Sequence, residues 1–155
     1  MELHLSNEAD TERLGNDLAE LTPDGIVCLD GTLGAGKTRL VRAFATSCGA
    51  DPTDVTSPTF TLWQTYLASR TIHHLDAYRI KDDDEFYELG VEELFDAPCV
   101  VFIEWANRIE NCLPTEGRLQ VSIEVISECE RNITLEATDS RVVEALSKLQ
   151  ERWGG

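Results

Sequence analysis

Residues 31–38, GTLGAGKT, constrain the fold of this chain more than any other segment. They match the pattern G-x-x-x-x-G-K-[ST] in full, which is a phosphate-binding loop when it joins a strand to a helix. Residues 26–29, IVCL, form a short β-branched apolar run before the loop, and apolar residues recur at helical spacing over 40–45 after it. The sequence therefore predicts a strand, a glycine-rich loop and a helix that ends near Gly49.

The loop predicts a site for a nucleoside triphosphate with Mg²⁺. No NKxD-like guanine reader is evident, but the residues alone leave ATP and GTP both open. Glycines let successive N–H groups converge on an anion, and the following helix adds its positive N-terminal dipole. Lys37 is expected to reach the β and γ phosphates, and the Thr38 hydroxyl to ligate Mg²⁺. The predicted nucleotide-binding residues are Gly31, Leu33, Gly34, Ala35, Gly36, Lys37, Thr38 and Arg39. The alternative is an ordinary strand-to-helix turn with a solvated lysine.

Hydrolysis requires a second acidic group at Mg²⁺ and a residue that positions water. Glu104 follows residues 99–103, CVVFI, a continuous apolar run typical of a strand covered on both faces. A Walker B carboxylate lies at the carboxyl end of such a strand, although an exposed glutamate is the alternative. Asp76 ends the run 71–75 and competes for the same work, the alternative there being a capping or turn aspartate.

Two further features stand near these candidates. His73 and His74 are adjacent, so on a strand they point to opposite faces, which disfavours a two-histidine metal site and leaves at most one facing the active site. Residues 57–60, SPTF, occupy the position where many P-loop NTPases carry a threonine that senses the γ-phosphate, here Thr59. A plain turn is an equally good interpretation of that segment.

The remaining patterns predict one α/β domain over residues 1–155. We expect a P-loop NTPase-like mixed sheet whose parallel centre holds 26–29 and 99–103, flanked by helices, with antiparallel hairpins at the edges. The other expected strands are 2–5, 61–66, 71–76, 119–125 and 131–137. One helix is expected through Leu14, Leu18 and Leu21, with Ser6 or Asn7 as its cap and residues 22–25 at its end. Further helices are expected over 81–89 and 91–95 and through Val142, Leu146 and Leu149.

Composition restricts the partners and the compartment. A net charge of −16 repels a phosphate backbone, so we expect any role on RNA to run through a partner. The five cysteines include no CxxC pair, which indicates reduced thiols in a cytosol. The start has no signal-peptide pattern, and no apolar run approaches the roughly 18 residues that span a bilayer. We therefore expect a cytoplasmic protein with no membrane contact.

Several motifs in one order resemble a known family: GTLGAGKT at 31–38, SPTF at 57–60, HLDAYR at 74–79 and IEW at 103–105. Together they are similar to the TsaE family, formerly YjeE, the small bacterial ATPases of tRNA threonylcarbamoyladenosine (t6A) synthesis. The resemblance extends from about residue 6 to residue 137. The P-loop alone is generic, whereas the other three motifs in this order are specific.

The resemblance implies an ATPase that drives turnover of a TsaB–TsaD-type complex, which attaches a threonylcarbamoyl group to the adenosine 3′ of the anticodon. The chain would then act on tRNA only indirectly. By the same resemblance Lys37 holds phosphates, Thr38 and Glu104 ligate Mg²⁺, and Asp76 is a catalytic-site carboxylate. The catalytic set is Lys37, Asp76, Glu104 and Thr59, with Thr59 in a switch-like segment and Trp105 packed nearby.

Departures from the family pattern are mild, namely Ala77 in place of a larger apolar residue and Ala106-Asn107 in place of a Pro-Glu-like pair. Arg131 either lies near the nucleotide or pairs with carboxylates, and Arg79 is the nearest candidate for an arginine finger in cis. Because no complete water-activating apparatus is evident, we expect low activity in isolation. Two other functions stay open, a small-molecule P-loop phosphotransferase and a non-catalytic nucleotide-binding switch.

Overall fold

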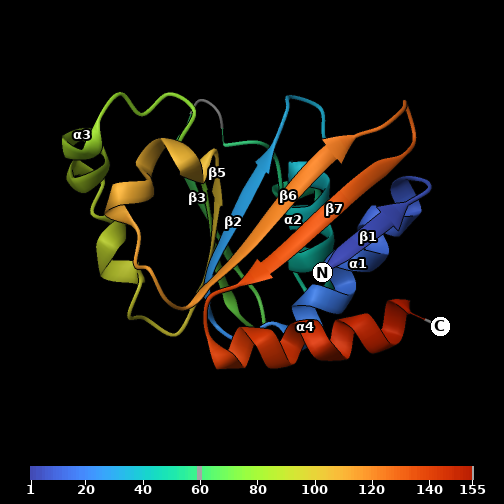
Figure 1. The fold of residues 1–155 in the computed structure, drawn as a ribbon. Helices are drawn as coiled ribbons and strands as arrows, with labels where there is room; N and C mark the ends of the chain where they lie inside the picture. The colour runs from blue at the N-terminus through green and yellow to red at the C-terminus, as the bar shows by residue number, and fades with distance from the viewer. Residues whose placement is uncertain (59–60, 155) are drawn as a thin grey trace.

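A computed structural model describes residues 1–58 and 61–154, and in this part of the chain one mixed sheet has the order β1-β7-β6-β2-β5-β4-β3 (Figure 1). The strands are β1 (Glu2–Leu5), β2 (Gly25–Gly31), β3 (Trp63–Leu67), β4 (Thr71–Asp76), β5 (Val100–Glu104), β6 (Arg118–Val125) and β7 (Arg131–Ala137). The α-helices are α1 (Glu8–Leu21), α2 (Lys37–Ser47), α3 (Asp83–Glu88) and α4 (Ser140–Trp153). Short 3₁₀ helices are η1 (Pro52–Asp54), η2 (Val91–Leu94) and η3 (Ala106–Cys112).

The centre of the sheet is parallel. Strand β2 pairs in parallel with β5 on one side and β6 on the other, and β4 extends the parallel set beyond β5. Antiparallel partners β3, β7 and β1 complete the two sides. The predicted α/β fold with a parallel centre and flanking helices is confirmed. The β3–β4 hairpin forms one edge of the sheet, whereas β1 lies outside the β6–β7 hairpin on the other side. In each hairpin the inner strand, β4 or β6, also pairs in parallel with the centre of the sheet.

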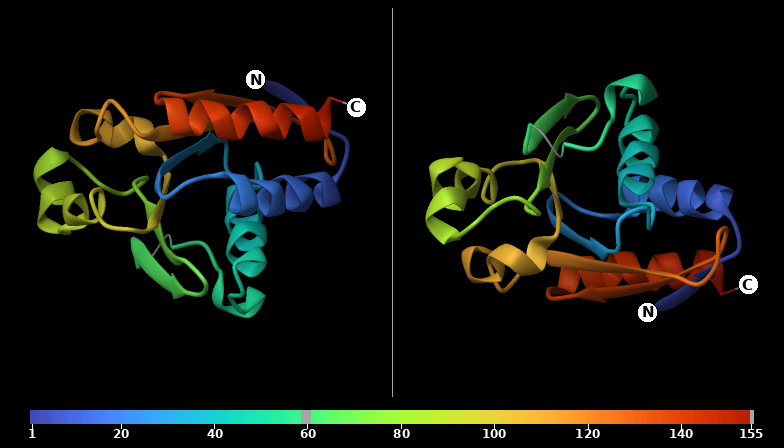
Figure 2. Two further views of the ribbon diagram at one scale, coloured as in Figure 1. Left: turned by 90° about the horizontal axis from the view of Figure 1, so that it is seen from below. Right: turned by 90° about the horizontal axis from the view of Figure 1, so that it is seen from above.

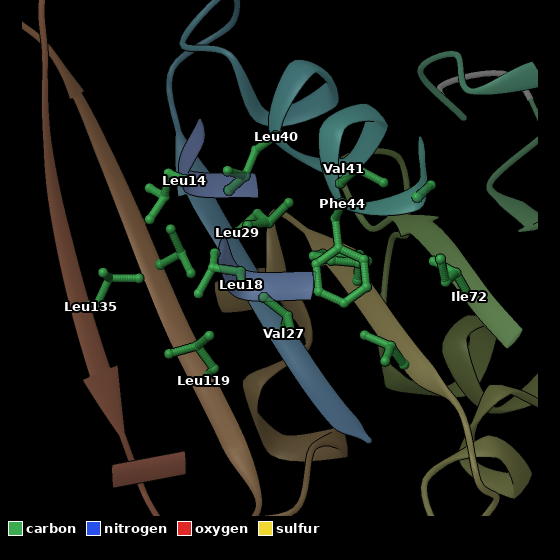
Figure 3. Packing of buried hydrophobic residues seen from close by; sticks show 14 of the residues in the cluster. Leu14, Leu18, Val27, Leu29, Leu40, Val41, Phe44, Ile72, Leu119 and Leu135 are labelled. Atoms are coloured by element: carbon green, nitrogen blue, oxygen red, sulfur yellow. The ribbon is translucent and has the colours of Figure 1, made fainter. Parts of the chain in front are cut away.

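Both faces of the central strands are covered, which explains their continuous apolar sequences. Val27 and Leu29 pack with α1, α2 and α4, whereas Ile26 and Cys28 pack with α3, η2 and η3. Figure 2 shows α1 and α2 on one side of the sheet and α3 on the other. In Figure 3, Leu40, Val41 and Phe44 of α2 point toward the sheet above Val27 and Leu29.

Helix α2 is fixed against the strand that ends in Glu104. The ring of Phe44 packs edge to face on Phe102 of β5, with centroids 4.9 Å apart, and both side chains are buried. The loop that follows β2 therefore lies beside the carboxyl ends of β4 and β5, while α4 crosses the opposite end of the sheet (Figure 1). This is the edge where open α/β sheets bind ligands.

Some boundaries differ from the predictions. Strand β3 begins at Trp63 rather than Thr61, because Leu62 has the left-handed φ of 61° and interrupts the extended chain. Strand β2 continues to Gly31, so the first glycine of the loop is still in the sheet. The sequence pattern gave no prediction for η3, which follows β5.

All five cysteines are free, and only Cys129 is exposed. Burial raises the pKa of the Cys28 thiol to about 12, so this group stays protonated at neutral pH. None of the helices in the described residues is long and apolar enough to cross a membrane.

Gly15 lets α1 pack closely on α2, and we expect Gly15→Ala to destabilise the protein. A Cβ at this position would lie 2.6 Å from Ala43 Cβ and 2.8 Å from the Leu40 carbonyl oxygen. Glycine to alanine inside a helix normally stabilises by about 0.5–1 kcal/mol, but overpacking costs about 1–3 kcal/mol. Urea unfolding followed by circular dichroism measures the difference. The matched control is Asn16→Ala, exposed on the same helix, with an expected change within about 0.5 kcal/mol. A G15A variant as stable as the wild type would contradict this packing.

Candidate functional site

The glycine-rich loop curls because two of its residues have left-handed backbones. Gly34 has φ of 79° and Gly36 has φ of 111°, conformations that strain any residue with a Cβ. Gly31 is required for space, since a Cβ there would lie 3.0 Å from Ala35 Cβ and 3.0 Å from the Ile123 carbonyl oxygen. Gly36 is the N-cap of α2 and has no side chain to accept a hydrogen bond from the first turn. The first N–H groups of the helix therefore face the loop without a side-chain acceptor at the N-cap.

A pocket of about 320 Å³ opens over this loop. Its walls come from the first turns of α1, the loop and start of α2, the ends of β4 and β5, and the β6–β7 hairpin. The lining residues are Glu8, Thr11, Leu33, Gly34, Ala35, Gly36, Lys37, Thr38, Arg39, Ser57, Asp76, Glu104, Trp105, Cys129 and Arg131. This volume lies at the lower end of the range for small-molecule sites.

Lys37 lies at the floor of the pocket and is only 6% exposed. Its Nζ donates to the Gly31 carbonyl oxygen at 2.5 Å and lies 4.5 Å from the centroid of the Trp105 ring. Burial lowers the pKa of the Lys37 ammonium, and the nearby carboxylates of Glu104 and Asp76 oppose that shift. The loop therefore directs one cation toward two carboxylates. The expectation that Trp105 packs near the site is confirmed.

Asp76 and Glu104 are directly opposite each other on the parallel strands β4 and β5, and both are buried. Like charges on facing residues repel each other, so the charged form of both carboxylates depends on neighbouring hydrogen-bond donors and on Lys37. The Tyr78 N–H donates to Asp76 Oδ1 at 2.9 Å. His74 Nε2 lies 2.9 Å from Glu104 Oε2. Mg²⁺ prefers oxygen ligands, so the carboxylates of Asp76 and Glu104 and the hydroxyl of Thr38 fit that ion.

The two histidines lie on opposite faces of β4, as predicted. His74 packs on the face that carries Glu104, whereas His73 Nδ1 accepts a hydrogen bond from Trp63 Nε1 at 3.1 Å. Burial lowers the pKa of His73. Its contacts tie β3 to β4, so only His74 belongs to the site.

Arg131 connects the β6–β7 hairpin to the loop. Its Nε donates to the Ala35 carbonyl oxygen at 2.9 Å, and one terminal nitrogen donates to the carbonyl oxygens of Ser127 at 2.8 Å and Glu130 at 2.9 Å. Arg131 lines the pocket, so it lies near the predicted nucleotide site, and its role toward a nucleotide stays a prediction. In the described part of the chain its hydrogen bonds go to main-chain oxygens, so it holds the loop in place.

Two other arginines, Arg39 and Arg79, are candidates for a charge in the pocket, and the lining includes the first of them. Arg39 lines it but is paired with carboxylates of α1, at 3.1 Å from Glu8 and 2.8 Å from Glu12. Arg79 is exposed in the turn after β4 and is absent from the pocket lining among the described residues. An arginine finger in cis therefore stays a prediction.

The structure gathers most of the predicted residues around one pocket. Gly31 ends β2 and contributes the carbonyl oxygen that holds Lys37, while Thr59 lies outside the described residues. Sequence reasoning missed Glu8 and Thr11 of α1 and Cys129 of the hairpin. Nothing local marks these three, because only tertiary packing brings them to the loop. The roles assigned to the predicted residues stay predictions.

Comparisons with known proteins agree on one family. The model for "Threonylcarbamoyl adenosine biosynthesis protein TsaE" matches residues 5–133. A Rickettsia felis protein named tRNA threonylcarbamoyladenosine biosynthesis protein TsaE is 40% identical over 148 residues, 93% of this chain and 85% of that protein. The Bacillus subtilis protein of the same name is 40% identical over 120 residues, 77% and 73% of the two chains. The crystal structure of Bacillus subtilis YdiB is similar with a TM-score of 0.80 and 30% identity, covering 98% of this chain and 95% of that one.

Proposed function

Because this chain belongs to the TsaE family of threonylcarbamoyl adenosine biosynthesis proteins, we propose that it is a Mg²⁺-dependent ATPase serving tRNA t6A synthesis. The observation that carries the proposal is the pocket in which a complete P-loop faces two buried carboxylates. ATP is the proposed nucleotide. Such a site supports phosphoryl transfer by positioning and by charge stabilisation, with little covalent chemistry.

Each residue has a defined part in this proposal. Lys37, which now donates to the Gly31 carbonyl oxygen, would exchange that partner for β- and γ-phosphate oxygens. Thr38 and Glu104 would hold Mg²⁺, which when bound would supply neutralisation of phosphate charge. Asp76, directly opposite Glu104, is the proposed carboxylate for orienting the attacking water. Thr59 is proposed to act in the neighbouring switch-like segment.

The proposed partner is a TsaB–TsaD-type complex, whose turnover the ATPase would support. With a net charge of −16, this chain has little attraction for a tRNA backbone, so RNA contacts are left to the partner. The two arginines that line the pocket, Arg39 and Arg131, are bound to carboxylates of α1 and to main-chain oxygens, which is consistent with low activity for the isolated chain.

Phosphate release from ATP by the purified chain, with and without a TsaB–TsaD pair, tests the proposal. We expect slow release alone and at least about tenfold stimulation by the pair, with no added small-molecule acceptor. Indifference to the pair would argue against this role. Release only with an acceptor would indicate a phosphotransferase, and tight ATP binding without any release would indicate a non-catalytic switch.

A further inference from the structure

His74 is a buried side chain beside the catalytic carboxylates, and the functions assigned so far do not use it. It is fully buried, and its Nε2 lies 2.9 Å from Glu104 Oε2. The other ring nitrogen, Nδ1, is buried and has no hydrogen-bond partner among the described residues. The ring of Tyr66 lies on one side of the His74 ring, with centroids 6.4 Å apart.

This asymmetry assigns the proton of the ring. A carboxylate only accepts hydrogen bonds, so Nε2 carries the hydrogen that it donates to Glu104. A hydrogen on Nδ1 would be a buried donor without a partner, which costs about 1–3 kcal/mol. The arrangement therefore favours the Nε2–H form, with Nδ1 bare, because Nδ1 has no partner in the part of the chain that the structure describes.

The strand register explains why Glu104 needs such a donor. Asp76 is directly opposite Glu104, while His74 precedes Asp76 by two residues and projects from the same face of β4. The glutamate side chain has three rotatable bonds, and repulsion from Asp76 disfavours any single orientation. A histidine ring on a central strand is far less free, because neighbouring side chains pack around it. His74 therefore fixes the end of a side chain that the strand alone does not fix.

We propose that His74 is a positioning residue whose Nε2–H holds one oxygen of Glu104, so that the carboxylate is preset to ligate Mg²⁺. The proposal rests on the proposed function, since it assumes a Mg²⁺-bound nucleotide in the pocket. Groups that orient a metal ligand through a hydrogen bond commonly change metal affinity by about 10- to 100-fold when removed.

Three variants separate the hydrogen bond from mere filling of space. His74→Gln places an amide nitrogen as many bonds from Cβ as Nε2, so it retains the donor. His74→Met has nearly the shape of glutamine but no donor, and His74→Asn offers an amide nitrogen at the position of Nδ1, too short to reach Glu104. His73→Asn, on the opposite face of β4, is the control for disturbing the strand. Thermal unfolding measures the stability of each.

The readout is ATP affinity by isothermal titration calorimetry, in Mg²⁺ and in EDTA. We expect Mg²⁺ to strengthen binding to the wild type, H73N and H74Q, and about 10- to 100-fold of that gain to be lost in H74M and H74N. Affinity in EDTA should be the same for all. An undiminished Mg²⁺ effect in H74M, or an equal loss in H74Q and H74M, would overturn the proposal. If H74N does not fold, the isosteric pair H74Q and H74M decides the matter. Failure of the wild type to bind Mg·ATP would instead refute the proposed function.

Discussion

Lys37→Ala is expected to lower ATP turnover by about 100- to 1,000-fold, the loss typical of removing one donor that stabilises transition-state charge. The Lys37 ammonium is the cation at the floor of the pocket, and the chain spends free energy to bury it there. Burial removes much of the water around this ammonium and therefore also lowers its pKa. Its present partner is the Gly31 carbonyl oxygen, which phosphate would replace. Phosphate release in the presence of the TsaB–TsaD pair measures the effect.

The control for this substitution is Lys148→Ala. Lys148 is an exposed lysine of α4 that forms an ion pair within the same helix, 2.8 Å from its Nζ to Glu144 Oε1. Its removal should leave turnover unchanged and alter stability by less than about 1 kcal/mol. If K37A and K148A hydrolyse ATP equally well while both remain folded, the loop is not the phosphate site.

Glu104→Gln and Asp76→Asn should each lower phosphate release by about 100- to 1,000-fold while nucleotide binding in EDTA persists. The two carboxylates lie opposite each other at the strand ends, so each substitution changes charge with little change in shape. Removing one of these two like charges also relieves the repulsion between the facing carboxylates. Neither variant is therefore expected to be much less stable than the wild type. Single-turnover phosphate release and calorimetry separate chemistry from binding.

Glu124→Gln serves as the matched control, since Glu124 is an exposed glutamate near the end of β6. It should behave as the wild type in both measurements. Should E104Q and D76N release phosphate at the wild-type rate while binding persists, hydrolysis does not depend on these carboxylates, and the non-catalytic switch becomes the better description.

The sequence predicted the features that depend on neighbouring residues. The P-loop, its flanking strand and helix, and the buried strand that ends in Glu104 all follow from local pattern and composition. Helix η3 escaped prediction because a short 3₁₀ segment has no hydrophobic period to detect. The late start of β3 depends on a single left-handed residue, Leu62, whose identity does not indicate that conformation.

The features that the sequence could not supply are contacts between distant segments. Asp76 was hard to place by pattern, yet the parallel register of β4 and β5 sets it directly opposite Glu104. Glu8 and Cys129 reach the pocket from α1 and from the β6–β7 hairpin, although they are 121 residues apart in the chain. Such pairings arise from the packing of whole elements, which no local window of sequence encodes.

The hydrogen bonds of Arg131 make the hairpin turn and the phosphate loop a single mechanical unit. Its planar guanidinium donates hydrogen bonds to the Ala35 carbonyl oxygen of the loop and to the Ser127 carbonyl oxygen of the turn. A displacement of the turn should therefore also displace Ala35. A protein that binds the outside of this turn could therefore shift the glycine-rich loop without entering the pocket.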